Sequence, residues 1–425
     1  MEFLLKQARI IAPGTDLHQQ QRDLLIRDGQ ILQIGTDLST KTGQVIESDD
    51  LHCAPGWFDT GVQGGDPGLE HREDLQSVSE AAARGGFTAI SLLPNTEPSL
   101  HSKSEISYIV RNQSNLPVEL LPVGAVSKDC AGVDITEMYD MYQSGAIAFS
   151  DGIHSIQNNG LMLRALQYVL AFDGRVINRP LDRSIGGQGQ MHEGLVSTSL
   201  GMKGLPNLSE ELMVIRDLTL AEYTQSKLHI ENISTRRSVE LIAQAKKRGI
   251  AVSCSVPILN LVFTDEALSQ FDEQFKVLPP LRTEDDRKAL IEGIMDGTID
   301  MVSSNHMPWD GESKNLEFPY AEFGAIGLET CYSIYQTYLS DLISLEDWQR
   351  LVCTRPRQTF GLAESKIEEG AQANLSVFDP SQEWEVKDQN LGSKSNNQPL
   401  LGKTLQGRIL ATFLGSSFWM VDKKG

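Results

Sequence analysis

The chain has 425 residues, of which 40% are hydrophobic, so it can bury a large core, and its length suits one barrel with a small accessory domain. Its 57 acidic and 37 basic residues give a formal net charge of −20, which disfavours attraction to nucleic acid or to an anionic membrane. No window approaches the roughly 20 apolar residues of a membrane span, and the first residues lack the layout of a secretory signal. We therefore expect a soluble, cytoplasmic protein that binds neither nucleic acid nor membrane.

The five cysteines are scattered along the chain, and no two of them form a CxxC pair. This spacing indicates neither a zinc knuckle nor a disulfide framework. We interpret them as free, buried thiols.

Both ends of the chain carry short apolar runs that are broken by turn residues. In the first 50 residues the breaks fall at Pro13-Gly14, Asp28-Gly29 and Gly35, which is typical of a meander of short strands. Asp-Gly in particular tolerates the positive φ that a hairpin turn needs. The tail repeats the pattern, so residues 1–50 and 363–425 are predicted to pair into one small β-domain.

Between residues 51 and 362, apolar strand candidates alternate with amphipathic segments of helical length, which is the pattern of βα units around a parallel sheet. The eight strand candidates are residues 54–61, 88–94, 118–125, 146–150, 175–179, 227–232, 251–255 and 300–305. Eight such units predict an α/β fold with a (β/α)8 barrel of the TIM type. In such barrels the functional groups stand at the C-terminal ends of the strands.

The strand ends carry motifs that resemble those of class I dihydroorotases in the amidohydrolase superfamily. The first strand has Pro55-Gly56 and then Asp59, in a frame that this family continues with His-x-His and Arg. Similar segments are Pro94-Asn95-Thr96, Ala148-Phe149-Ser150-Asp151-Gly152, Lys276-Val277-Leu278-Pro279-Pro280-Leu281-Arg282 and Ser304-Asn305-His306-Met307-Pro308. The resemblance covers nearly the whole chain. It implies the barrel of a zinc-dependent hydrolase that acts on cyclic amides.

Most positions that bear the chemistry of this family hold other residues here. The resemblance places its metal-ligand or catalytic positions at Gly61, Gln63, Arg179, Asn232 and Asn305, its arginine at Gly65 and a substrate-contacting Asn at Leu278. Arg179 puts a permanent cation where a dication would sit, which repels a metal ion. The sequence therefore predicts a degenerate site with no zinc, no other cofactor and no catalytic residue.

Two carboxylates remain near this site, Asp59 and Asp151, and the resemblance places Asp151 on a metal-associated carboxylate. We interpret both as structural, and we predict that Arg179 pairs with one of them, because a buried unpaired guanidinium costs several kcal/mol. Asn95 stands where the family has a substrate-binding Asn. Together with Arg282 and His306, it is a candidate for residual ligand binding.

The remaining polar residues of interest have plainer interpretations. His71 and Glu73 lie at a predicted helix start, where we interpret them as capping groups. His154 and His192 are interpreted as surface residues of loops over the barrel mouth. His229 is expected to point away from the metal side of the sixth strand.

Three functions fit these observations. The first is a non-catalytic dihydroorotase homologue of pyrimidine biosynthesis, because some members of this family are similar to silent subunits that assemble with aspartate transcarbamoylase. The second is an active cyclic amidohydrolase that interconverts dihydroorotate and carbamoyl-aspartate at an atypical site. The third is a binding protein for a small anionic metabolite, recognised by Arg179, Asn95 and Arg282. We favour the first, as a homodimer at least and with aspartate transcarbamoylase as its partner.

Overall fold

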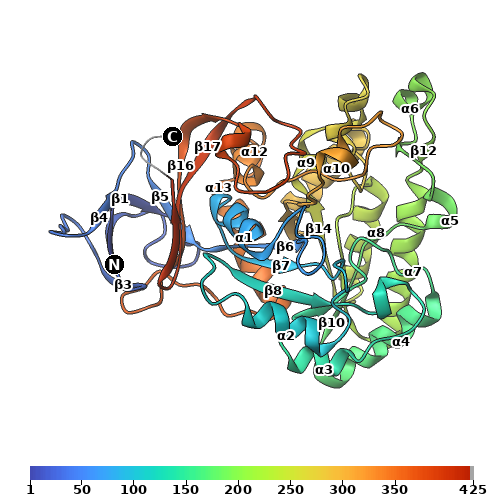
Figure 1. Ribbon diagram of the computed structural model, residues 1–425, viewed down its shortest axis with the longest axis horizontal. Coiled ribbons are helices and arrows are strands. Elements are labelled where there is room, and N and C mark those ends of the chain that lie inside the picture. The colour runs from blue at the N-terminus through green and yellow to red at the C-terminus, as the bar shows by residue number, and fades with distance from the viewer. Residues whose placement is uncertain (422–425) are drawn as a thin grey trace.

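The computed structural model describes residues 1–421 and consists of a parallel barrel beside a sheet built from both chain ends (Figure 1). The barrel strands run in the order β15-β14-β13-β10-β9-β8-β7-β6, and every recorded pairing between them is parallel. Their bounds are β6 Trp57–Val62, β7 Phe87–Leu92, β8 Glu119–Gly124, β9 Ala148–Phe149, β10 Arg175–Asn178, β13 Lys227–Ile230, β14 Val252–Pro257 and β15 Met301–Ser303. The predicted fold class is confirmed.

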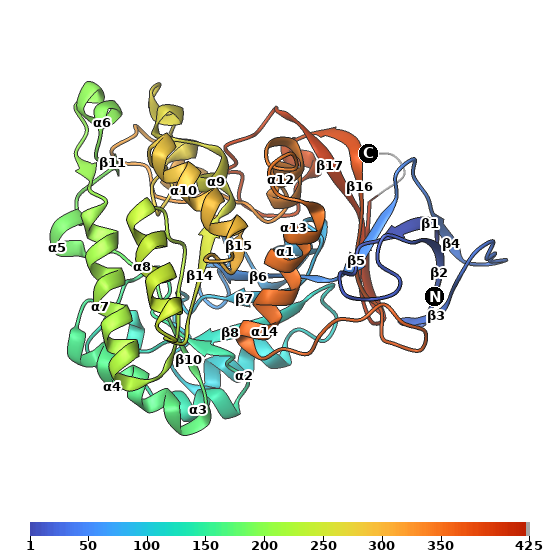
Figure 2. The ribbon, with the colours of Figure 1, turned by 180° about the vertical axis from the view of Figure 1, so that it is seen from behind.

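Helices cover the outside of the barrel (Figures 1 and 2). Those of eight residues or more are α1 Leu75–Arg84, α2 Lys103–Arg111, α4 Asn159–Val169, α7 Leu208–Thr224, α8 Arg236–Lys247, α10 Glu284–Met295 and α12 Cys331–Tyr338, and α3 Met138–Gln143 is shorter. Shorter elements are α5 Arg183–Gly186, β11 Met191–His192, α6 Leu195–Leu200, β12 Gly204–Leu205, α9 Ile258–Val262, α11 Gly311–Lys314, α13 Leu345–Gln349 and α14 Arg355–Phe360. No helix within residues 1–421 has both the length and the apolar character needed to cross a membrane.

Local sequence signals explain where these helices begin and end. The N-cap of α1 is Asp74, whose carboxylate accepts a hydrogen bond from Ser77 N at 2.7 Å. Capping by His71 and Glu73 was therefore the wrong interpretation, since the cap follows them. After α8, Gly249 has φ of 82°, a left-handed conformation that favours glycine just beyond a helix end.

The barrel closes between its first and last strands through a side chain. Asp59 on β6 accepts hydrogen bonds from Ser304 N, at 3.1 Å to Oδ1 and 3.2 Å to Oδ2. Beyond the end of β6, a backbone bond adds to this contact, because Gln63 N donates to His306 O at 3.0 Å. Asp59 therefore performs the structural role that the sequence indicates, although its partner is the backbone after β15.

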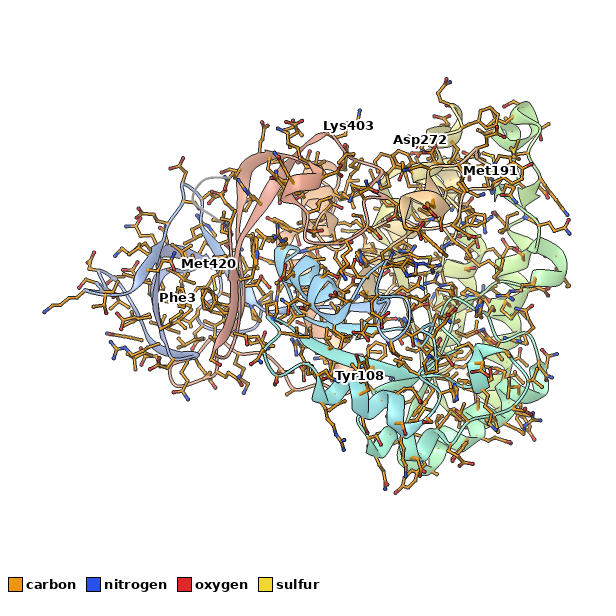
Figure 3. The ribbon with its side chains drawn as sticks, viewed as in Figure 1. Phe3, Tyr108, Met191, Asp272, Lys403 and Met420 are labelled. Carbon is orange, nitrogen blue, oxygen red and sulfur yellow. The ribbon has the colours of Figure 1, made fainter. Side chains whose placement is uncertain are left out.

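The second sheet joins the two ends of the chain in the order β18-β17-β16-β5-β1-β2-β3, with β4 paired to β1. Its strands are β1 Glu2–Ile10, β2 Gln21–Arg27, β3 Gln30–Gly35, β4 Gln44–Ile46, β5 His52–Pro55, β16 Asn374–Glu385, β17 Thr404–Leu414 and β18 Ser417–Met420. Phe3 and Met420 lie together in this sheet in Figure 3, and the rings of Phe3 and Phe418 are 4.7 Å apart. The segment predicted as one strand from 54 to 61 spans the end of β5 and most of β6.

Trp57 connects this sheet to the barrel. Its backbone N–H donates to Ser376 Oγ at 3.2 Å, and its indole Nε1 donates to Gln349 Oε1 at 2.7 Å. The ring is fully buried and lies 5.2 Å from the ring of Tyr332 and 5.3 Å from that of Phe378. One side chain thus contributes to the packing of both parts of the molecule.

We expect Trp57→Ala to lower the free energy of unfolding by about 3–5 kcal/mol, because it leaves a cavity and orphans the Gln349 amide oxygen. Urea denaturation followed by circular dichroism measures this change. The matched control is Leu195→Ala, which truncates a side chain that is 89% exposed and should change stability by less than about 0.5 kcal/mol. Equal effects of the two substitutions would contradict the role assigned to Trp57.

Candidate functional site

Arg179 lies at the C-terminal end of β10, buried against Glu231 from the end of β13. Its Nε is 3.1 Å from Glu231 Oε2, and the two side chains are 3% and 2% exposed. The predicted pairing of Arg179 with Asp59 or Asp151 is therefore wrong. The arginine does find a buried carboxylate, as a buried guanidinium requires.

Gly61 provides the space that Glu231 fills. A Cβ atom built at residue 61 would lie 2.3 Å from Glu231 Oε1, and Gly61 has φ of 84°, which disfavours any side chain there. A histidine at this position would collide with the glutamate. Gly61 and Glu231 are thus complementary to each other, and the glycine is more than a lost ligand.

Asn232 and Asn305 extend the Arg179–Glu231 pair into a buried hydrogen-bond network. Asn305 Oδ1 accepts from Arg179 Nη2 at 3.3 Å and from Asn232 Nδ2 at 3.0 Å. Asn305 Nδ2 donates to the backbone carbonyl of Leu278 at 3.1 Å. An aspartate at residue 305 would lose that donor. The degenerate positions therefore form a buried polar cluster that suits their present residues, in which Arg179 Nη1 has no hydrogen-bond partner within residues 1–421.

The nearby carboxyl groups differ in their surroundings. Burial raises the pKa of Asp59 to about 7, and the charge of Glu231 adds to this shift although hydrogen bonds from Ser304 oppose it. Burial also raises the pKa of Glu231, against the opposing effect of Arg179. Asp151 is bound by Ser127, whose N–H donates to it at 2.8 Å and whose hydroxyl donates to it at 2.6 Å. Burial raises its pKa as well.

Gln63 and Gly65 follow β6. Gln63 is buried, and its Oε1 has no hydrogen-bond partner within residues 1–421. A Cβ atom at Gly65 would lie 2.2 Å from Glu73 O and 2.3 Å from Leu69 O. The loop is folded tightly over this position, so no other side chain fits at residue 65 without a shift of the backbone.

The three candidates for residual ligand binding are all engaged within the protein. Asn95 donates to Asp151 O at 3.0 Å and accepts from Ile153 N at 2.8 Å. Arg282 donates to Ser234 Oγ at 3.0 Å and to the Leu205 carbonyl at 2.8 Å. Its guanidinium also lies 3.6 Å from the buried carboxylate of Glu210, which is hydrogen bonded to Ser234 and to the N-terminus of α8.

His306 is buried and lies against Glu73. Its Nδ1 accepts from Gly327 N at 3.2 Å, which leaves the ring proton on Nε2 in the neutral form, 3.4 Å from Glu73 Oε2. Glu73 also binds Ser393 Oγ, and Lys394 N at 3.2 Å. The pair fastens the loop after β6 to the end of β15, a contact that sequence reasoning missed.

His192 and His229 are structural as well. His192 was predicted to lie on the surface, but it is buried beside Arg282, and burial lowers its pKa to about 4. His229 lies between the hydroxyls of Ser253 and Ser255, at 2.9 and 3.2 Å. The interpretation of His192 as a surface residue is therefore wrong.

The site does not fit a zinc ion. Within residues 1–421 there is no group of three or more His, Cys, Asp or Glu side chains arranged to hold a metal. The Arg179 guanidinium and the Glu231 carboxylate lie between the strand ends where the resemblance places the metal. The absence of zinc from the protein itself stays a prediction.

Comparison with known proteins agrees with this fold and these motifs. Residues 53–238 match the family model described as dihydro-orotase-like. The chain is 36% identical to a dihydroorotase of Acetivibrio thermocellus over 424 residues, 99% of each chain. It is 37% identical to one of Pelotomaculum thermopropionicum, covering 100% of this chain and 99% of the relative. The chain belongs to the dihydroorotase family.

Solved structures of other proteins share this fold. An L-hydantoinase (dihydropyrimidinase) from Arthrobacter aurescens superposes with a TM-score of 0.85 at 22% identity, over 99% of this chain and 97% of that one. A D-hydantoinase superposes with a TM-score of 0.82 at 20% identity, over 100% of this chain and 96% of that one. At this identity the likeness shows the fold, a barrel with an additional sheet from the chain ends.

In this dihydroorotase family member we expect Arg179→Met to lower the free energy of unfolding by about 3–5 kcal/mol, because it leaves Glu231 buried without its cation. Arg179→Met combined with Glu231→Leu should recover most of that loss, since both charges are then removed. Urea denaturation of the two single variants and the double variant gives the coupling energy. As a control, Arg237→Met breaks an exposed pair and should cost less than about 1 kcal/mol. If the double variant were less stable than Arg179→Met, the unpaired charge of Glu231 would not be the source of the loss.

Asp59 should make stability fall as pH rises. Its folded pKa of about 7 lies above the unfolded value of about 3.9, so the folded state holds the proton more tightly. The contribution of protonated Asp59 to the free energy of unfolding is fully present below about pH 4 and is lost as the pH rises to about 7. We expect Asp59→Asn to flatten the pH dependence of the unfolding free energy between pH 4.5 and 7.5, whereas Asp16→Asn, at an exposed site, should leave it unchanged. Parallel pH profiles for wild type and Asp59→Asn would contradict this prediction.

Proposed function

We propose that this member of the dihydroorotase family is a non-catalytic protein of pyrimidine biosynthesis that acts by association. The observation that carries the proposal is the buried Arg179–Glu231 pair at the position of the family's metal centre. Hydrolysis of a cyclic amide needs an activated water, an electrophile for the carbonyl and a general base. In this chain the polar groups at those positions bind one another instead.

One observation favours an alternative, an active cyclic amidohydrolase with an atypical site that interconverts dihydroorotate and carbamoyl-aspartate. The pKa of Asp59, about 7, is the value that suits a general base at neutral pH. The two relatives compared above also carry the name dihydroorotase. Against this alternative, Asp59 is completely buried, and both of its oxygens accept hydrogen bonds from Ser304 N.

An exposed apolar stripe on α7 supports association. Leu208, Leu212, Ile215 and Tyr223 lie on one face of the helix and are 49%, 40%, 42% and 74% exposed. The two ends of the stripe lie seven residues before Ile215 and eight residues after it, and Leu212 has no exposed apolar counterpart on the C-terminal side. Two antiparallel copies of α7 would therefore place each end of the stripe against the opposite end in the second copy, as a two-fold dimer requires. We assign this face to the homodimer.

The function is tested on purified full-length protein. We expect no conversion of dihydroorotate or carbamoyl-aspartate and far less than one zinc per chain by elemental analysis. We also expect light scattering to give the mass of a dimer, and a larger mass after mixing with aspartate transcarbamoylase from the same organism. Ile215→Glu should reduce the dimer to monomer by placing a charge in the stripe, whereas Leu170→Glu changes a leucine of similar exposure just after α4 and should not.

Three results would each contradict a part of the proposal. Turnover that survives metal chelation would favour the atypical hydrolase, and Asp59→Asn should then abolish it. No increase in mass with aspartate transcarbamoylase would remove that enzyme as the partner. A dimer that persists in Ile215→Glu would place the dimer interface outside α7.

A further inference from the structure

A pocket of about 640 Å³ lies where the barrel meets the sheet, at the N-terminal end of β8. Its walls come from the start of β8, from the segment that follows α14, and from β16 and β18. Figure 2 shows the segment after α14 crossing from the barrel to the sheet. Arg179 follows the C-terminal end of β10, so the pocket lies at the other end of the barrel from the degenerate site. A pocket of this size holds a small metabolite.

Arg357 lines this pocket and is buried without a counter-charge. Of the three arginines that are buried within residues 1–421, Arg179 and Arg282 face carboxylates, whereas Arg357, at 5% exposure, forms no ion pair. A buried guanidinium without a carboxylate is costly. The position therefore favours an anionic group that reaches Arg357 from the pocket.

The contacts of Arg357 within the protein are with neutral oxygens. Its guanidinium donates to the carbonyls of Gly56 and Ala363 and to the hydroxyl of Thr88, each at 3.3 Å. Its Nε has no hydrogen-bond partner within residues 1–421. These bonds are at the long end of the usual range, so they fix the side chain without neutralising its charge.

The same pocket also holds acceptors for a cation. Asn374 Oδ1 is buried, and no partner for it exists within the described part of the chain. It meets Arg357 at Gly56, because it lies 2.0 Å from the position of a Cβ atom there and the Gly56 carbonyl accepts from Arg357. An open acceptor and an uncompensated cation thus lie on one wall.

The exposed rim of the pocket is acidic. It carries three carboxylates and one ammonium, which belong to Glu119, Glu364, Glu368 and Lys366. A simple anion would be repelled by these carboxylates on its way to Arg357. A zwitterion suits both regions, since its negative end can face the buried guanidinium while its positive end faces the rim.

We propose that this pocket binds a free α-amino acid with an aliphatic side chain. The carboxylate of the amino acid pairs with Arg357, and its ammonium binds Asn374 and the carboxylates of the rim. Leu116, Val118 and Leu414 supply apolar surface for the side chain. A second carboxylate on the ligand, as in aspartate, is disfavoured by the charge of the rim.

The bound amino acid contacts both parts of the molecule, because Arg357 and Val118 belong to the barrel and Asn374 and Leu414 to the sheet. Binding therefore stabilises the folded state and should raise the midpoint of thermal unfolding. The site needs neither the association proposed above nor the loss of activity at the barrel mouth. Failure of one proposal leaves the other standing.

The test is isothermal titration calorimetry on the full chain with L-leucine and two analogues that each lack one charged group. Isocaproate is leucine without its ammonium, and isoamylamine is leucine without its carboxylate. We expect leucine to bind with a millimolar or tighter Kd. Isocaproate, isoamylamine and L-aspartate should each bind at least about tenfold more weakly.

Arg357→Met should weaken the binding of leucine by about tenfold or more, because it removes the partner of the carboxylate. Since Arg357 also holds the backbone at Gly56, Ala363→Trp is a second variant that leaves the guanidinium in place. Ala363 is an exposed residue of the lining, so a tryptophan there fills the pocket and should abolish leucine binding in a folded protein. Circular dichroism checks that each variant is folded.

Glu364→Gln should reduce the preference for leucine over isocaproate, because it removes one carboxylate that faces the ammonium. Glu47→Gln is the matched control, since Glu47 is an exposed glutamate just after β4 and outside the lining, and it should bind leucine as wild type. No binding of leucine, binding of isocaproate or isoamylamine as tight as that of leucine, or unchanged leucine binding by folded Ala363→Trp would each overturn the proposal.

Discussion

The Arg179–Glu231 ion pair is the interaction on which the rest of the barrel mouth depends. Each charge is almost completely buried, so each would be costly without the other. The pair requires a glycine at residue 61, because Glu231 fills the space of a side chain there. It also requires an amide at residue 305, which accepts from Arg179 and donates to the backbone of Leu278. Four positions thus form one unit.

This unit links strand ends that a metal ion joins in a zinc barrel. Arg179 follows β10, Glu231 follows β13 and Asn305 follows β15, so one network of hydrogen bonds spans half of the barrel rim. Asp59 then joins β15 to β6 and closes the ring. Protein dipoles and charges thus hold these strand ends together.

Much of the fold follows from sequence periodicity, whereas the partners in the site do not. Alternating apolar strands and amphipathic helices predicted the barrel, and the joined chain ends were also predicted. Glu231 was missed because strand alternation stops at Ile230, and Asn232 takes a left-handed φ of 58° that reorients the chain. The contact between Glu73 and His306 joins residues far apart in sequence, so no local pattern signals it. His192 was misread for the same reason, since Arg282 lies 90 residues away.

The interdependence of these residues also explains why no single substitution can rebuild a metal site here. A histidine at residue 61 would collide with Glu231, and removing Glu231 to make room would leave Arg179 buried without a counter-charge. Replacing Arg179 first would leave the Glu231 carboxylate buried without a counter-charge. Each single step passes through a destabilised intermediate, so the present network is a local optimum of stability. Surfaces outside the network, such as the exposed face of α7, are free of that constraint, and new roles can arise there without disturbing the barrel.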